Sequence, residues 1–322
     1  MNTGNLLQTK RIEYIDIAKG LGMILVVIGH SINGMSFPGL WIWSFHMPLF
    51  FILSGLCFTD NKYPTFIPFL KKRIKTLLLP SIYFSLLVAV LSFILLKRNI
   101  FPDLTVNLPG ALWFVLVLFF TEIFYYPIFK FTKENKISRI IILISLLIFG
   151  LCLSREKIVL PFSLSSIPIA SFYYGIGHSY KTLINKITTT HIIRFKIFIS
   201  FLLLIIPAIV TFYSNKSINM NGNHFSQPEL LYIIISLSGT IGIILLSTTK
   251  LELYKKIFLY IGKNTLIILS LHMFFISLSS NYIQPFINND LVYKSIEQAI
   301  IWILTVISIT FINKKAIWLL GK

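Results

Sequence analysis

Three ionisable residues lie inside the first long apolar segment of the chain. Asp16, Lys19 and His30 are separated by 3 and 11 residues. Because an α-helix turns by about 100° per residue, an interval of 11 residues returns to within roughly 20° of the same face. The helical rise of about 1.5 Å per residue places Lys19 and His30 about 16 Å apart along the axis. The segment therefore predicts one polar stripe, with a cation near one end and an imidazole near the other.

Three more polar side chains, His46, Glu122 and His272, lie in other apolar segments. Ionisable groups are costly inside a bilayer, so they usually face the interior of a helix bundle or pair with one another. Imidazole titrates near neutral pH and can act as a general base, although a histidine can also only hydrogen-bond a neighbouring carbonyl. Glu122 either orients a histidine, binds substrate or ties helices together. Together with His30, these residues predict one shared internal site.

The composition indicates that a membrane-embedded helix bundle positions these residues. Hydrophobic residues make up 56% of the 322-residue chain, charged residues only 12%, and the mean hydropathy is +0.81. A soluble domain of this size needs far more charged surface. A transmembrane helix takes roughly 17 to 25 mostly apolar residues. We expect an all-α integral membrane protein, a single domain over residues 1–322 with about ten transmembrane helices. The candidate segments are 15–33, 42–59, 77–96, 111–129, 139–154, 160–180, 197–213, 229–248, 264–283 and 298–313.

The basic residues support this division of the chain. With the N-terminus inside, the inner loops hold 22 of the 29 Lys and Arg residues and the outer loops hold six. Short cytoplasmic loops carry such an excess, so we expect both termini in the cytoplasm. The net charge of +18 then follows from topology rather than from nucleic-acid binding, which needs basic residues gathered on one folded face.

The first apolar segment has no small-residue cleavage site, so we expect a membrane helix rather than a cleaved signal peptide.

Five motifs, in this order and spacing, resemble the acyltransferase family 3 of membrane acyltransferases, and within it the fucose 4-O-acetyltransferase-like branch. The resemblance covers the first four candidate spans and the ninth. The motifs are RIEYIDIAKGLGMILVVIGH, SFHMPLFFILSG, FLKKRIKTLLLPSIYF, ALWFVLVLFF and IGKNTLIILSLH. The family's essential histidine falls on His30. The family also has a basic residue eleven positions earlier, commonly arginine, and here this position is Lys19. The lysine is a departure, because it cannot make the bidentate phosphate contact of a guanidinium.

The resemblance for His30, Lys19 and the basic cluster, and residue chemistry for the others, give a set of expected site residues. His30, with Glu122 and His272, is the expected catalytic group. Lys19 and the basic cluster before the third span suit the phosphates of coenzyme A, although ordinary loop charge accounts for most of that cluster. The cluster comprises Lys71, Lys72, Arg73 and Lys75, and donor contacts are expected from Lys72, Arg73 and Lys75. Substrate contacts are expected from Asp16, His46 and Trp113, where the tryptophan either stacks on a sugar ring or anchors the helix at the membrane interface.

The implied activity is O-acyl transfer at a bacterial cytoplasmic membrane. Acetyl would pass from cytoplasmic acetyl-CoA, a co-substrate rather than a tightly bound cofactor, to a hydroxyl of a cell-surface polysaccharide or its lipid-linked precursor. The expected partners are therefore an acyl-CoA, a glycan acceptor and membrane lipid, without nucleic acid. No metal site is expected, because no ligand spacing of the usual kind is present. A polysaccharide succinyltransferase and a transporter or flippase of lipid-linked sugar are the alternatives.

Overall fold

The computed structural model describes residues 12–32, 36–59, 63–133, 135–189, 193–249 and 252–322. Within these ranges, nine helical segments are long and apolar enough to span a membrane. They are Glu13–Ser31, Phe37–Leu56, Phe66–Leu96, Pro102–Phe131, Lys136–Arg155, Ile193–Ser214, Glu229–Leu246, Thr265–Phe286 and Asp290–Lys315. The predicted all-α membrane architecture is confirmed. The N-terminus, which the charge pattern predicts to be cytoplasmic, lies outside the described residues.

The sixth predicted segment, 160–180, is not among these nine and forms a shorter element. A 3-10 turn at Pro161–Ser166 precedes α8 (Ile167–Ser179), which has 13 residues. Prolines at 161 and 168 and the left-handed backbone of Phe162 and Ser163 interrupt a longer helix. Thirteen residues extend only about 20 Å, compared with about 30 Å of hydrocarbon. The helix lies inside the bundle instead, and a Cβ on Gly55 would meet the carbonyl of Tyr174, so its backbone packs directly on α3 (His46–Leu56).

Two of the long segments are broken where polar side chains enter the bundle. The second consists of α2 (Phe37–Trp43) and α3, with a turn at Ser44 and Phe45 directly before His46. The third joins α4 (Phe66–Arg73) to α5 (Leu79–Leu96) through a π-helical turn at Ile74–Leu78. π-Helical turns are frequent at functional sites, and this one follows Arg73 immediately.

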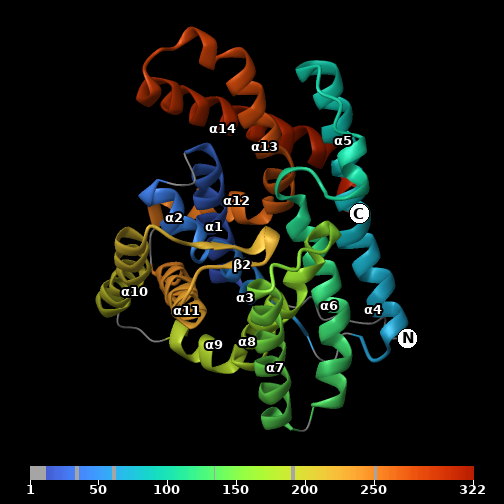
Figure 1. The fold of residues 1–322 in the computed structure, drawn as a ribbon, viewed down its shortest axis with the longest axis vertical. Helices are drawn as coiled ribbons and strands as arrows, with labels where there is room; N and C mark the ends of the chain where they lie inside the picture. Colours follow the sequence, from blue (N-terminus) through green and yellow to red (C-terminus); the bar gives the residue numbers. More distant parts are fainter. Residues whose placement is uncertain (1–11, 33–35, 60–62, 134, 190–192, 250–251) are drawn as a thin grey trace, which may run out of the picture.

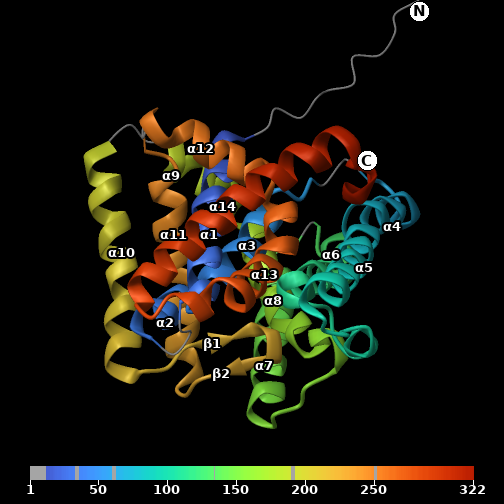
Figure 2. The ribbon, with the colours of Figure 1, turned by 90° about the horizontal axis from the view of Figure 1, so that it is seen from above.

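Helix α1 (Glu13–Ser31) forms the centre of the molecule. It packs against α3, α12 (Glu252–Lys263) and α13 (Thr265–Tyr282), and lies with α3 between α10 (Ile193–Ser214) on one side and α4 and α5 on the other (Figures 1 and 2). Glycines allow the closest approach, because a Cβ on Gly20 would meet the carbonyl of Phe258 and one on Gly262 that of Asp16. The polar stripe of α1 therefore lies within protein.

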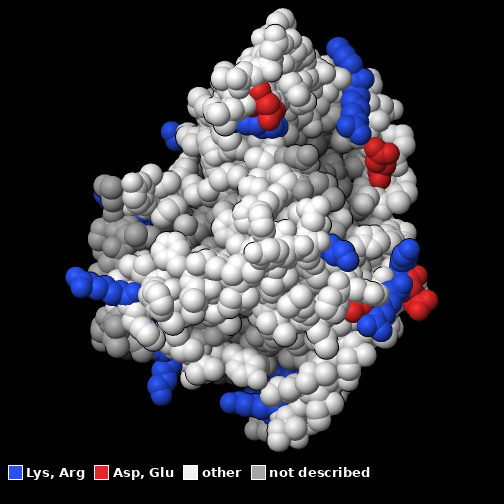
Figure 3. Space-filling model, turned by 60° about the vertical axis from the view of Figure 1, so that its left-hand side comes forward, with Lys and Arg blue, Asp and Glu red and all other residues white. Residues whose placement is uncertain are grey.

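Four other long helices, one short helix and one hairpin complete the fold over the described residues. The helices are α6 (Trp113–Phe131), α7 (Lys136–Arg155), α11 (Glu229–Leu246) and α14 (Asp290–Lys315). Exposed phenylalanine and isoleucine side chains cover α7, α10 and α14, as expected for helices that face lipid. Figure 3 shows a broad uncharged surface with charged side chains mainly at its margins. The short helix α9 (Lys181–Thr189), α12 and the hairpin of β1 (Ile218–Asn219) and β2 (His224–Phe225) occupy segments that the sequence analysis assigned to loops.

Candidate active site

Three histidines from three helices form a cluster. We call it the outer cluster, and the group of residues around Glu122 the inner cluster, after their sides in the predicted topology. His30 lies in the last turn of α1, His46 begins α3, and His272 lies in the middle of α13. The ring of His30 has its centroid 5.3 Å from that of His272 and 6.4 Å from that of His46. The indole of Trp43, at the end of α2, lies 6.2 Å from His30. The structure thus brings together three of the residues that the sequence singled out.

Backbone carbonyls fix two of these imidazoles. Nδ1 of His46 lies 3.0 Å from the Ile42 carbonyl oxygen, and Nδ1 of His272 lies 2.9 Å from that of Ile268. A carbonyl only accepts, so each Nδ1 donates and each neutral ring keeps its lone pair on Nε2. Nε2 of His272 is buried and has no hydrogen-bond partner among the described residues. Both rings are buried, whereas His30 is half-buried.

An inner cluster surrounds Glu122 of α6. Arg73 forms an ion pair with the carboxylate, and the hydroxyl of Tyr174 donates to Oε1 at 3.4 Å. Lys19 of α1 also interacts electrostatically with Glu122, and its Nζ lies 4.0 Å from Sγ of Cys57. The side chain of Glu122 is 5% exposed and that of Arg73 22%. These contacts place Glu122 with the expected donor-binding residues rather than with the histidines, and they favour its role in tying helices together.

The remaining predicted residues take different positions. Lys72 and Lys75 are exposed, so of the basic cluster only Arg73 reaches into the bundle. Asp16 is buried where α1 meets α12. Trp113 is buried at the start of α6 with its ring 6.3 Å from Phe114. That burial favours a place in the core over an anchor at the membrane interface.

A buried carboxylate beside the histidines was missed by the sequence analysis. Ser31, the residue after His30, donates a hydrogen bond to Oε2 of Glu297. The hydroxyl of Tyr293 donates to Oε1 at 2.6 Å, and Lys294 lies 3.2 Å from Oε2. The predicted last span began at residue 298, which assigned Glu297 to a loop, whereas α14 begins at Asp290. The spacing of Tyr293 and Glu297 by four residues was the available signal.

The fold and these clusters define a multi-pass α-helical membrane protein with ionisable groups buried in the bundle. Comparison with family models matches the acyltransferase domain of acyltransferase family 3 over residues 12–313. The match covers nearly the whole chain, and the protein belongs to this family of membrane acyltransferases. No curated protein and no solved structure gave a match. The match is to the family as a whole, so the fucose 4-O-acetyltransferase-like branch stays a prediction.

Proposed function

We propose that the protein moves an acetyl group from cytoplasmic acetyl-CoA to a hydroxyl of a cell-surface polysaccharide or its lipid-linked precursor. The main support is the arrangement along α1. This helix carries Lys19 beside the Arg73 and Glu122 pair and, eleven residues further, His30 beside two other histidines. The separation of about 16 Å along the helix suits a donor bound through phosphates at one end whose thioester reacts at the other.

In this proposal the outer cluster performs the chemistry. Nε2 or Nδ1 of His30 accepts the proton of the acceptor hydroxyl while the oxygen forms a bond to the thioester carbonyl carbon. The tetrahedral intermediate then collapses and its carbon–sulfur bond breaks. The leaving coenzyme A thiolate takes the proton from His30. His46 and His272, which are fixed through Nδ1, present their lone pairs to the acceptor's other hydroxyls.

Trp43 supplies a donor for the developing negative charge. Its Nε1–H is buried and has no hydrogen-bond partner among the described residues. The centroid of its ring lies 6.2 Å from that of the proposed base, His30. A buried donor left without a partner costs about 1 to 3 kcal/mol. A carbonyl oxygen that becomes an oxyanion in the transition state provides that partner, as in other acyl-transfer sites.

The inner cluster binds the donor. Lys19 and Arg73 place positive charge inside the bundle, and the exposed Lys72 and Lys75 lie at its mouth. Coenzyme A phosphates compete with Glu122 for Arg73, whereas Lys19 is available as a point charge. The pantetheine arm then follows α1 toward His30. In the predicted topology this direction runs from the cytoplasm toward the outer face of a bacterial cytoplasmic membrane, with both termini inside.

Purified protein tests the proposal directly. Incubation with acetyl-CoA and a candidate surface glycan should release free coenzyme A and add one acetyl mass to the glycan. Succinyl-CoA in place of acetyl-CoA separates the two acyl groups. A transporter or flippase consumes no acyl-CoA with any glycan. Mass analysis of surface polysaccharide from a deletion strain identifies the acceptor, and an unchanged acylation pattern with lost export would refute acyl transfer.

A further inference from the structure

A polar cavity lies close to the outer cluster, and the chemistry described above does not use it. It has a volume of about 280 Å³ and lies between α5, α13 and the connection from residue 97 to 110. Its size is near the lower end of the roughly 300 to 1,000 Å³ typical of small-molecule sites. The polar side chains that line it are Ser92, Arg98, Asp103, Asn107 and Ser277.

Two residues that line the cavity lie close in the chain to predicted site residues. Met273, which lines it, directly follows His272 in α13. Gly110, also in the lining, has φ +58° and lies so close to α13 that a Cβ would be 3.0 Å from Cβ of Met273. A 3-10 turn from Gly110 leads into Trp113 and α6. In the predicted topology the connection lies on the outer side, where the acceptor is presented.

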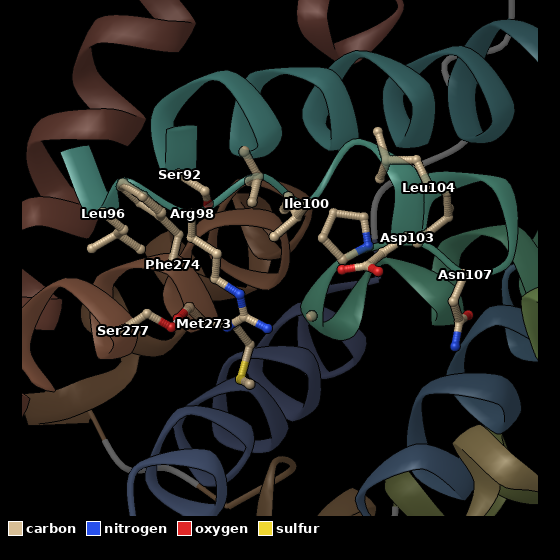
Figure 4. A pocket seen from close by; sticks show the side chains of 14 residues that line it. Ser92, Leu96, Arg98, Ile100, Asp103, Leu104, Asn107, Met273, Phe274 and Ser277 are labelled. Carbon is tan, nitrogen blue, oxygen red and sulfur yellow. Dashed lines mark hydrogen bonds between the residues drawn. The ribbon is translucent and has the colours of Figure 1, made fainter. Parts of the chain in front are cut away.

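The charged side chains of the cavity are open to a ligand. Arg98 and Asp103 are both exposed, and neither has an ion-pair partner among the described residues. Arg98 extends across the cavity toward Met273, while Asp103 and Asn107 approach from the opposite part of the lining (Figure 4). A guanidinium recognises carboxylate or phosphate groups, and a carboxylate accepts hydrogen bonds from hydroxyls. A ligand with an anionic group at one end and hydroxyls at the other satisfies both.

We infer that this cavity binds the acceptor, and that the acceptor is an anionic saccharide whose carboxylate or phosphate lies on Arg98 and whose hydroxyls lie on Asp103 and Asn107. The inference rests on the proposed function for its assignment as acceptor site. A saccharide held here has its next ring or substituent directed along α13 toward His272. The anionic group is either a uronic-acid carboxylate or the phosphate of a lipid-linked sugar, since a guanidinium binds both.

The test compares three soluble probes that differ in charge. Methyl glucoside is neutral, methyl glucuronoside carries a carboxylate, and glucose 1-phosphate carries a phosphate. Binding to the purified full-length protein is measured by titration calorimetry, and coenzyme A release from acetyl-CoA is measured in the same samples. The variants are Arg98→Gln and the matched control Lys97→Gln, which removes the neighbouring positive charge outside the cavity lining. Thermal unfolding of each variant confirms that it is folded.

The wild-type protein should bind at least one anionic probe about 10- to 100-fold more tightly than methyl glucoside, the range for a hydrogen bond to a charged group. Arg98→Gln should remove that preference, and Lys97→Gln should keep it. Preference for one anionic probe over the other identifies carboxylate or phosphate as the natural group. Equal binding of all three probes, binding of none, or a preference that survives Arg98→Gln would overturn the inference. Charge-selective binding without coenzyme A release from any anionic probe would instead refute the proposed acetyl transfer, and with it the acceptor role, and would leave the cavity as a binding site for an anionic saccharide.

Discussion

Replacement of His30 by alanine tests the proposed base most directly. The loss of a general base typically lowers the rate by 10² to 10⁴, which corresponds to about 2.7 to 5.4 kcal/mol of transition-state stabilisation. The change should leave the fold intact, because His46 and His272 keep their hydrogen bonds to carbonyls of their own helices. His30 is also half-buried, so its removal does not leave a sealed void in the core.

The assay follows acetyl transfer to the glycan at saturating acetyl-CoA, with thermal unfolding in detergent as the measure of folding. The control is His224→Ala, which removes an exposed histidine from β2 and should leave both measurements unchanged. A His30→Ala protein that unfolds at the wild-type temperature and retains near-normal transfer would refute the assignment. The base would then be sought at His272, whose Nε2 is buried and has no hydrogen-bond partner among the described residues.

Four further changes test separate parts of the structure. Lys19→Ala should raise the apparent KM for acetyl-CoA with little change in kcat, as measured by initial rates, because it removes a contact to the coenzyme A phosphates and none to the reacting atoms. Arg73→Gln should destabilise the fold by about 3 kcal/mol in thermal or denaturant unfolding, since it leaves Glu122 buried without its cation, and the double change with Glu122→Gln should recover most of the loss. Trp43→Phe should lower kcat by roughly 10²-fold without changing the KM for acetyl-CoA, and an unchanged kcat would exclude the indole as a donor. Gly55→Ala should cost about 1 to 3 kcal/mol of stability, because the added methyl meets the backbone of α8.

The sequence predicted the helices and the outer cluster because both depend on local signals. Long apolar runs are sufficient to predict membrane helices, and the interval from Lys19 to His30 is set by helix geometry alone. The convergence of His30, His46 and His272 was also predictable, since polar groups in lipid-embedded helices face inward. The sixth segment did not form a long helix, although its prolines and serines were visible in the sequence.

The partners of individual side chains were not predictable from the sequence. Whether Glu122 meets a histidine or Arg73 depends on where the end of α4 lies against α6, and the π-helical turn that follows Arg73 has no local sequence signal. Glu297 was assigned to a loop because the predicted span began one residue later, and only the longer α14 places it beside Ser31. Such pairings depend on the packing of distant segments rather than on any one segment's periodicity.

The difference in burial among the three histidines favours His30 as the base. A base that takes a proton from the acceptor must return it to the leaving thiolate or to water in every turnover. His46 and His272 are buried, and each is held by a hydrogen bond from Nδ1 to the preceding turn, so their rings have little freedom to turn. His30 is half-buried at the end of α1, with both neighbouring imidazoles within 6.4 Å. Of the three it alone combines contact with the cluster and partial exposure, which leaves its ring room to exchange a proton, whereas the two fixed rings offer lone pairs in constant positions that suit orientation of the acceptor.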